Sequence, residues 1–345
     1  MSTVAIDAIT AGSVYPSVVT DRSGRVHVVY YPGGGTLRYA TCASLCIAAS
    51  SWQVATIDTG LGYAQSDYRT SIGVDATGRV HVAYLDGVSG ASSIDLTMYA
   101  TCAQRCGSAA NWSRVPIDSD GAEPVLAAAA SGSVSLFFKS TGWAYATCAS
   151  GCDTLLNWHR ATVDTGGLKD WTSIALDPAG GAHVAYLRME FWAQLRYGAC
   201  VTACDNAAAW QTTALPESVD FHSNPVLAAG SDGRLHLALN GSTYATCASA
   251  CTSAASWRVL SVDSTSFPVY AALAVSGDRV ALAHSDLYDG GLRLATCSGN
   301  CVVRRSWTTH LVDPARAVGL GAVAIDGGGR IRVVYVANGR LVYAE

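Results

Sequence analysis

One short string recurs along the whole chain and restricts the folds that the chain can adopt. Each copy reads Tyr-Ala-Thr-Cys or a close variant, and six copies carry a second Cys four residues after the first. Full or partial copies begin at Tyr39, Tyr99, Tyr145, Tyr197, Tyr244, Leu294 and Tyr343. Seven copies in 345 residues give a period of about 49, which is typical of four-stranded propeller blades.

Each repeat contains four segments with the pattern of short strands. In the second repeat they cover residues 71–74, 79–84, 96–101 and 112–117, and the turn Asp75-Ala76-Thr77-Gly78 joins the first two. β-branched and aromatic residues alternate with small or polar ones in these segments, and Gly, Asp and Ser separate the segments. No window of the chain shows a convincing helical period. The pattern therefore predicts an all-β fold.

The strand count predicts the number of blades and the way the ring closes. Innermost strands begin near Pro16, Ser71, Pro124, Thr172, Pro225, Tyr270 and Gly321. Outer strands open at only six tryptophans, Trp52, Trp112, Trp158, Trp210, Trp257 and Trp307. Residues 3–7 resemble an outer strand, and their pairing with residues 340–344 would remove an exposed edge. We predict one domain, residues 1–345, that is a seven-bladed β-propeller of four-stranded antiparallel blades. Its N-terminal strand closes the last blade, and a capped solenoid is the alternative.

All 12 cysteines belong to the repeat. The pairs are Cys42/Cys46, Cys102/Cys106, Cys148/Cys152, Cys200/Cys204, Cys247/Cys251 and Cys297/Cys301. Their even number and constant short spacing predict local disulfides formed in an oxidising compartment, so we expect a secreted or periplasmic protein whose leader peptide is absent from this chain. Zinc or copper binding is one alternative, although each loop supplies two ligands where structural zinc needs four. A redox site is another, although it would need one distinctive cysteine.

Composition excludes several classes of function. Charged residues make up 14% of the chain, the formal net charge is −4 and mean hydropathy is +0.23. A disordered chain is poorer in apolar residues and richer in charge, and no apolar run approaches the ~20 residues that span a bilayer. The absence of a basic tract argues against nucleic acid and anionic membranes as partners. We expect a monomer, with no cofactor and no metal site.

Repeated polar and aromatic side chains are predicted to be structural. The second strand of four repeats carries a histidine in the same place, at His27, His81, His183 and His236. We expect these histidines to hydrogen-bond across neighbouring blades, and a ring of ligand-binding histidines is the alternative. The repeat tyrosines and the outer-strand tryptophans are expected to fill the wedge-shaped gaps between blades. In the Asp-x-x-Gly turns, Asp caps the turn and Gly supplies a positive φ.

The sequence at residues 173–186, Ser-Ile-Ala-Leu-Asp-Pro-Ala-Gly-Gly-Ala-His-Val-Ala-Tyr, is followed by Leu-Arg-Tyr-Gly-Ala-Cys at 195–200. This recurring pattern resembles secreted bacterial propeller proteins with sialidase-type (BNR-like) repeats. The resemblance covers essentially the whole chain and implies the fold. It does not imply one activity, because such propellers include lectins, lyases and glycosidases. The sialidase Asp box, Ser-x-Asp-x-Gly-x-x-Trp, does not occur, and no arginine triad can be assigned.

A binding site is expected where loops vary over the rigid ring. The cysteine loops are uniform, whereas the connections on the opposite face differ between repeats. Residues just before the innermost strands should lie nearest the central channel. The candidate ligand-binding residues are Tyr15, Tyr68, Arg69, Glu123, Asp170, Trp171, Arg188, Glu190, Trp192, His222 and Tyr288. Their variety favours one composite pocket over seven equivalent sites.

Several chemistries fit these candidates. In a lyase, Tyr68 or His222 would transfer a proton and Arg69 would neutralise an acidic substrate. In a glycosidase, Glu123 would form an acid/base pair with Asp170 or Glu190. Calcium would suit the carboxylate-rich loop at residues 286–289, but no full ligand set with a recognised spacing is present.

The sequence therefore predicts a secreted, lectin-like propeller that recognises a glycan or another extracellular ligand through its variable face. The first alternative is a carbohydrate-active enzyme, either a polysaccharide lyase or a glycoside hydrolase, with one composite site at the mouth of the central channel. The second alternative is a scaffold for protein partners.

Overall fold

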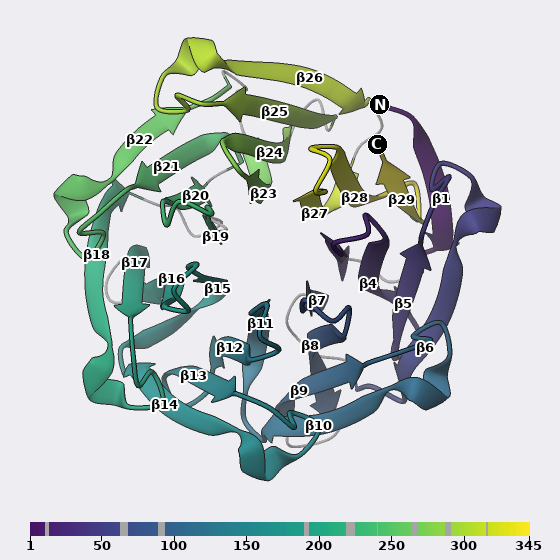
Figure 1. Cartoon of the computed structure of the whole chain (residues 1–345), viewed down its shortest axis with the longest axis horizontal. Coiled ribbons are helices and arrows are strands. Elements are labelled where there is room, and N and C mark those ends of the chain that lie inside the picture. The colour runs from purple at the N-terminus through teal and green to yellow at the C-terminus, as the bar shows by residue number, and fades with distance from the viewer. Residues whose placement is uncertain are drawn as a thin grey trace.

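The computed structural model describes residues 1–10, 14–62, 68–88, 94–189, 193–218, 225–239, 241–263, 268–286, 291–314 and 317–345. Only the backbone is described at residues 14, 68, 88, 94, 168–170, 216–218, 268–270, 286 and 317–321. Seven antiparallel sheets surround a central channel (Figure 1). The predicted seven-bladed propeller is confirmed. In these ranges the helices are short 3₁₀ turns, and none is long or apolar enough to cross a membrane.

The first four blades follow one another along the chain, and their strands are given from the channel outwards. Blade 1 contains β3 (Ser17–Thr20), β4 (Val26–Gly33), β5 (Thr36–Cys42) and β6 (Gln53–Thr59). Blade 2 contains β7 (Tyr68–Val74), β8 (Val80–Val88), β9 (Ile94–Cys102) and β10 (Ser113–Asp118). Blade 3 contains β11 (Ala122–Ala128), β12 (Val134–Lys139), β13 (Trp143–Cys148) and β14 (His159–Asp164). Blade 4 contains β15 (Gly167–Leu176), β16 (Ala182–Met189), β17 (Ala193–Cys200) and β18 (Gln211–Ser218).

The last three blades complete the ring. Blade 5 contains β19 (Val226–Ala229), β20 (Leu235–Leu239), β21 (Thr243–Cys247) and β22 (Arg258–Ser261). Blade 6 contains β23 (Pro268–Ser276), β24 (Arg279–Asp286), β25 (Leu292–Ser298) and β26 (Trp307–Asp313). Blade 7 contains β27 (Ala317–Ile325), β28 (Ile331–Ala337), β29 (Arg340–Ala344) and β1 (Thr3–Ala8).

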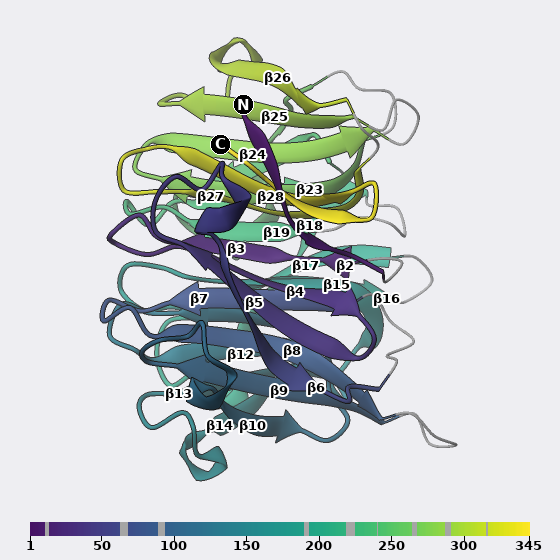
Figure 2. The ribbon, with the colours of Figure 1, turned by 90° about the vertical axis from the view of Figure 1, so that its right-hand side faces the viewer.

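The N-terminal strand closes blade 7. β1 pairs antiparallel with β29, with Val4 opposite Tyr343. Ser2 and Glu345 exchange backbone hydrogen bonds of 2.9 and 3.1 Å beside this pair. The two ends of the chain consequently lie side by side (Figures 1 and 2). The predicted pairing of residues 3–7 with residues 340–344 is confirmed.

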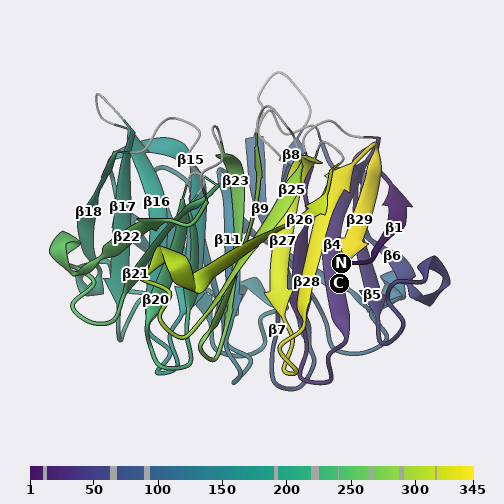
Figure 3. The ribbon, with the colours of Figure 1, turned by 90° about the horizontal axis from the view of Figure 1, so that it is seen from above.

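The antiparallel order sorts the connections onto two faces of the ring (Figure 3). We call the face with the first-to-second-strand hairpins and the cysteine loops the turn face. The opposite face, with the remaining connections and the channel entrance, is the mouth face. The two faces are built from different parts of the repeat, so each can vary without the other.

Disulfides link all twelve cysteines within their own loops on the turn face. The bonds are Cys42–Cys46, Cys102–Cys106, Cys148–Cys152, Cys200–Cys204, Cys247–Cys251 and Cys297–Cys301. The predicted pairing is confirmed, and no free cysteine is left to bind a metal or to act as a thiol. Each loop also contains a 3₁₀ turn that the sequence did not predict: Ala49–Ser51, Ala109–Asn111, Leu155–Asn157, Ala207–Ala209, Ala254–Ser256 and Arg304–Ser306.

The second cysteine of each pair has a further contact that the sequence did not predict. Its backbone carbonyl oxygen accepts a hydrogen bond of 2.8–3.0 Å from the indole Nε1–H of the tryptophan six residues later. The accepting residues are Cys46, Cys106, Cys152, Cys204, Cys251 and Cys301. Each disulfide therefore constrains the loop that positions the tryptophan, in addition to stiffening the surface.

The six outer-strand tryptophans join neighbouring blades. Each ring packs edge-on against the repeat tyrosine of the preceding blade, with centroids 5.0–5.4 Å apart. The pairs are Trp52–Tyr343, Trp112–Tyr39, Trp158–Tyr99, Trp210–Tyr145, Trp257–Tyr197 and Trp307–Tyr244. The predicted packing of these aromatic residues between blades is confirmed.

The interface between blades 6 and 7 is different. Leu294 stands where the other blades have the tyrosine, and β1 contains no tryptophan. Smaller side chains meet here, because Ala272, Ala283 and Leu294 of blade 6 form one cluster with Val323 and Tyr335 of blade 7. This interface therefore closes through aliphatic packing in place of the aromatic pair.

A second set of contacts joins blades through aspartates at the ends of outer strands. Each of these carboxylates accepts a hydrogen bond of 2.5–2.8 Å from a second-strand tyrosine in the next blade, in the pairs Asp7–Tyr30, Asp58–Tyr84, Asp164–Tyr186 and Asp313–Tyr335. Burial, together with this hydrogen bond, raises the pKa of Tyr30 and Tyr84 above its usual range. The tyrosines therefore stay protonated and act as donors.

The second-strand histidines bond within their own blades, so the prediction that they bond across blades is wrong. Each Nδ1 lies 2.6–2.7 Å from the repeat tyrosine hydroxyl, in the pairs His27–Tyr39, His81–Tyr99, His183–Tyr197 and His236–Tyr244. Strand register explains the difference. His27 is paired with Thr41, which makes Tyr39 its diagonal neighbour on the adjacent strand, and diagonal neighbours are within reach of long side chains.

Trp112→Ala should lower the free energy of unfolding by about 3–5 kcal/mol, the usual cost of removing a buried tryptophan. The variant loses the packing against Tyr39 and the hydrogen bond to Cys106. Leu156→Ala is the control, because that side chain is 89% exposed. Urea unfolding measures both variants, and equal midpoints would contradict the assigned role of the tryptophan.

Stability should fall as the pH drops below about 6.5, the usual pKa of histidine. Burial lowers the pKa of His27 and His81, and it lowers that of His236 to about 4. The unfolded chain therefore binds protons on these groups at a higher pH than the folded chain does. His236 alone lowers the free energy of unfolding by on the order of 3 kcal/mol as the pH falls from 6.5 to about 4.

Unfolding free energies measured between pH 8 and pH 4.5 check this expectation. His81→Gln should flatten the acid limb of the curve, whereas His159→Gln, at an exposed position, should leave it unchanged. A stability that stays constant from pH 7 to pH 5 would show that the buried histidines do not resist protonation.

Candidate functional site

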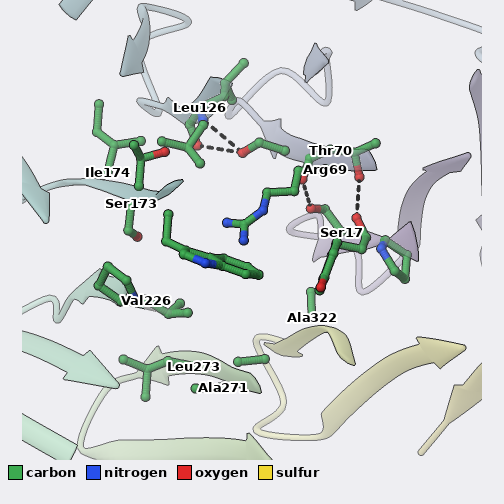
Figure 4. A pocket seen from close by; sticks show the side chains of 18 of the residues that line it. Ser17, Arg69, Thr70, Leu126, Ser173, Ile174, Val226, Ala271, Leu273 and Ala322 are labelled. Carbon is green, nitrogen blue, oxygen red and sulfur yellow. Dashed lines mark hydrogen bonds between the residues drawn. The ribbon is translucent and has the colours of Figure 1, made fainter. Parts of the chain in front are cut away.

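A cavity of about 180 Å³ lies in the central channel and is lined by the innermost strands of all seven blades. Arg69 extends into it from blade 2, among side chains of the surrounding blades (Figure 4). Three of the predicted candidates, Tyr15, Arg69 and Trp171, form part of its wall. They belong to β2 (Val14–Tyr15), β7 and β15. The cavity is therefore a composite of residues that differ between blades.

A cation packed between two aromatic rings dominates this end of the channel. The Arg69 guanidinium carbon lies 3.0 Å from the centroid of the Trp171 ring and 5.2 Å from that of Tyr15. The two aromatic rings meet edge to face, with centroids 5.5 Å apart and planes at 89°. Both rings are largely buried, at 9% and 8% exposure, whereas Arg69 is half-buried. A cation in this position is held by the electron-rich ring faces.

Backbone pairing brings these three side chains together. β2 adds to blade 2 as a parallel fifth strand, in which Tyr15 lies opposite Arg69. The hydroxyl of Thr70 donates to the carbonyl oxygen of Tyr15 at 3.2 Å and fixes this short pairing. Blade 1 and blade 2 are therefore joined by backbone at the channel mouth, which sets the position of Tyr15 beside the guanidinium.

Glu123 holds the other side of the cluster in place. Its carboxylate accepts a hydrogen bond of 2.6 Å from the backbone N–H of Trp171, and Lys139 lies 3.5 Å from the other carboxylate oxygen. Glu123 has φ 53° and Trp171 has φ 84°, both in the region that disfavours side chains. Residues held in such conformations cluster at functional sites, where the surrounding structure enforces them. The buried carboxylate supplies that enforcement here.

Hydroxyl groups line the blade 1–4 side of the channel and tie the innermost strands together. Ser17 donates to the carbonyl oxygen of Thr70, and Ser71 accepts from the Leu126 N–H at 2.9 Å. Ser173 accepts from the Leu227 N–H at 2.8 Å. The blade 6 and 7 side is aliphatic and is lined by Ala271, Ala272, Leu273, Ala322 and Val323. The channel thus has one polar wall and one apolar wall.

The structure brings four of the predicted site residues together: Tyr15, Arg69, Glu123 and Trp171. Arg188 lies elsewhere on blade 4 and forms an ion pair of 3.4 Å with Asp164. Tyr68 and Asp170 belong to β7 and β15, but their side chains fall outside the described residues. Glu190, Trp192, His222 and Tyr288 also fall outside them. The ligand-binding roles of all eleven residues stay predictions.

The disulfide cysteines take no part in the channel cavity. None of them lines it, because all six loops are on the opposite face of the ring. Two of the cysteines do border hollows on the turn face, Cys251 between blades 4 and 5 and Cys301 between blades 5 and 6. The cysteines of the described chain are therefore structural, and any chemistry at the mouth depends on other side chains.

Sequence reasoning missed Lys139 and the channel hydroxyls. Lys139 ends a second strand, and no repeated pattern connects it with Glu123 along the sequence. The hydroxyls do leave a signal, because Thr70-Ser71 and Thr172-Ser173 occupy matching places in the innermost strands of blades 2 and 4. The calcium prediction rests on residues 286–289, whose side chains lie outside the described part. Within that part, no group of three or more metal-ligating side chains occurs.

No protein-family profile and no curated protein matches the chain. Solved structures do share its fold. An ulvan lyase of polysaccharide lyase family PL25, bound to -[GlcA(1-4)Rha3S]-, has a TM-score of 0.65 at 11% identity, covering 99% of this chain and 94% of the other. The Aleuria aurantia lectin with Fucα1-6GlcNAc has a TM-score of 0.56 at 12% identity, with coverages of 89% and 98%. The NanB sialidase from Streptococcus pneumoniae has a TM-score of 0.57 at 10% identity, with coverages of 100% and 71%. At these identities the similarity shows the propeller fold alone.

Glu123→Ala should lower the free energy of unfolding by about 3 kcal/mol, because it removes a buried charged partner of the Trp171 N–H and of Lys139. Glu123→Gln should recover part of this loss, since its amide oxygen still accepts from the N–H. Asp153→Ala, at an exposed position in a cysteine loop, is the control. Chemical denaturation measures all three variants. A Glu123→Ala protein as stable as the control would show that the carboxylate does not hold Trp171.

Proposed function

We propose that the chain is a secreted carbohydrate-binding propeller that recognises an acidic glycan through one composite site at the channel mouth. The observation that carries this proposal is the Arg69 guanidinium packed between Tyr15 and Trp171. Aromatic faces stack against the apolar faces of sugar rings, and a guanidinium binds carboxylate or sulfate groups. The cluster therefore combines stacking against a sugar ring with binding of its acidic group at one place.

The asymmetry of the channel supports a single site. Arg69, Glu123 and Trp171 have no counterparts at the matching positions of the other blades, whereas a lectin with one site per blade would repeat its binding residues. The preorganised geometry also supports recognition, because the strained backbone at Trp171 is fixed before any ligand arrives.

The solved structures with the same fold add a second line of support. The ulvan lyase is bound to a saccharide that contains glucuronate and a sulfated rhamnose, and the Aleuria aurantia lectin is in complex with a fucosylated sugar. Secretion is supported by the six disulfides, since such bonds form and persist in oxidising compartments.

Purified protein screened on an array of neutral and acidic glycans tests the proposal. We expect binding to acidic glycans that Arg69→Ala weakens by about tenfold or more, the usual loss for a hydrogen bond to a charged group. Arg69→Lys should also bind more weakly, because lysine keeps the charge and loses the planar stacking. Arg258→Ala, at an exposed position on the outer strand β22, is the control.

The same experiment separates the alternatives. A rise in ultraviolet absorbance from an unsaturated sugar product would identify a lyase, and new reducing ends without that absorbance would identify a hydrolase. Binding that Arg69→Ala leaves intact would move the site away from the channel mouth. If no glycan on the array binds and none is cleaved, the carbohydrate proposal fails and the protein-scaffold alternative is favoured.

A further inference from the structure

Histidine, tyrosine and aspartate form a repeated group on the turn face. In three blades the histidine Nδ1 faces the repeat tyrosine, and Nε2 faces the first residue of the Asp-x-x-Gly turn. The Nε2–carboxylate distances are 3.4 Å for His27–Asp21, 3.5 Å for His81–Asp75 and 3.1 Å for His183–Asp177. A carboxylate only accepts hydrogen bonds, so Nε2 carries the proton and Nδ1 accepts from the tyrosine hydroxyl. The aspartate thus completes the hydrogen bonding of His27 and His183, whereas His81 Nε2 makes only the longer contact with Asp75.

Blade 5 keeps the histidine and the tyrosine but lacks the aspartate, because Gly230 stands in its place. His236 Nδ1 lies 2.6 Å from the Tyr244 hydroxyl, as in the other blades. Asp232 accepts a hydrogen bond of 3.0 Å from the backbone N–H of Arg234, and its carboxylate lies 3.8 Å from the Arg234 guanidinium. It forms no ion pair with the histidine. Among the described residues, Nε2 of this histidine, which is 6% exposed, has no hydrogen-bond partner.

A hollow of about 420 Å³ opens beside His236, between blades 5 and 6. Arg234 is part of its wall, with a side chain that is 40% exposed. The matching hollow between blades 4 and 5, of about 590 Å³, also reaches a histidine, but there Asp177 already faces His183 Nε2. Blade 5 therefore combines an unoccupied donor, an open hollow and a nearby guanidinium.

We propose that this hollow binds a carboxylate, which takes the place of the aspartate that blade 5 lacks. One carboxylate oxygen accepts the Nε2–H of His236, as Asp21 and Asp177 do for the histidines of blades 1 and 4. The guanidinium of Arg234, which is 40% exposed and only loosely paired with Asp232 at 3.8 Å, supplies the opposite charge on the same wall. Asp232 and Asp278 also line the hollow and repel anions in general, so occupation depends on the direct bond to the histidine.

The protonation states of the site suit this role. Burial lowers the pKa of His236 to about 4 and raises that of Tyr244 to about 12. At neutral pH the tyrosine therefore keeps its hydroxyl proton, and the histidine is neutral with one N–H to donate. A metal ion is a poor alternative occupant, because no group of three or more metal-ligating side chains occurs in the described part of the chain.

A variant that rebuilds the aspartate tests the proposal. Gly230→Asp combined with Asp232→Thr recreates the Asp-x-Thr-Gly turn of blade 2. The new side chain has room, since a Cβ at position 230 lies 3.4 Å from His236 Nε2. Its closer approach, 2.6 Å to the Asp232 carboxylate, is removed by the second substitution. In the double variant the internal carboxylate should occupy the hollow permanently.

Wild-type protein with isotope-labelled histidine is titrated with sodium glucuronate and, separately, with N-acetylglutamate, and the imidazole signals are followed by NMR. His236→Gln identifies the relevant signal, and glucose is the neutral control. We expect a saturable shift of the His236 signal with at least one acid, none with glucose, and at least tenfold weaker affinity in the double variant. A response to glucuronate alone indicates a sugar carboxylate, and a response to N-acetylglutamate alone indicates a peptide carboxylate.

A second pair of variants guards against a folding artefact. Arg234→Gln should weaken carboxylate binding, whereas Arg79→Gln, at the same turn position in blade 2, should not, and thermal unfolding confirms that both are folded. The proposal is overturned if neither acid gives a saturable shift, or if the double variant binds as tightly as wild type. Because this hollow is on the turn face, glycan binding at the mouth is tested separately, and either proposal can fail alone.

Discussion

The contact between each outer-strand tryptophan and the tyrosine of the preceding blade is the interaction on which the rest of the ring depends. A disulfide constrains the cysteine loop, whose carbonyl oxygen holds the indole N–H, as Cys106 holds Trp112. The indole then packs against Tyr39, and the hydroxyl of that tyrosine bonds to His27. The disulfide, the tryptophan, the tyrosine and the histidine are therefore linked by direct contacts that cross from one blade to the next.

Because these contacts repeat in most blades, the two faces of the molecule differ in how much they can vary. The repeated contacts fix the blades relative to one another, which leaves the mouth face free to differ from blade to blade. Glu123 and Trp171 are the positions where this freedom has been used to hold a side chain in an unfavourable backbone conformation. On the turn face, Gly230 replaces the aspartate and leaves Nε2 of His236 without the partner that His27 and His183 have.

Repetition also decides how much could be predicted from the sequence. The period, the missing seventh tryptophan and the cysteine spacing predicted the blade number, the closure and the disulfides. The bond from each indole to a cysteine carbonyl, such as Cys46 in blade 1, was missed, because spacing alone does not show which way a loop carbonyl points. The partners of His27 were predicted wrongly, because a repeat shows that a residue is shared but not which neighbour it faces.

The mouth site is made of residues that do not repeat. The stacking of Arg69 on Trp171 depends on a positive φ and on Glu123, 48 residues earlier in the chain, and no local pattern contains that information.

The closing of the ring gives it one seam. Blade 7 is held to blade 1 by the Trp52–Tyr343 pair. It meets blade 6 through aliphatic side chains around Leu294 and the hydrogen bond from Tyr335 to Asp313, without such an aromatic pair. Blade 7 also contains both ends of the chain, so its outer edge is pinned by β1. Under heat or mechanical load the ring is therefore expected to part first between blades 6 and 7. The opened ring would be an arc of seven blades in which blade 7 stays attached to blade 1.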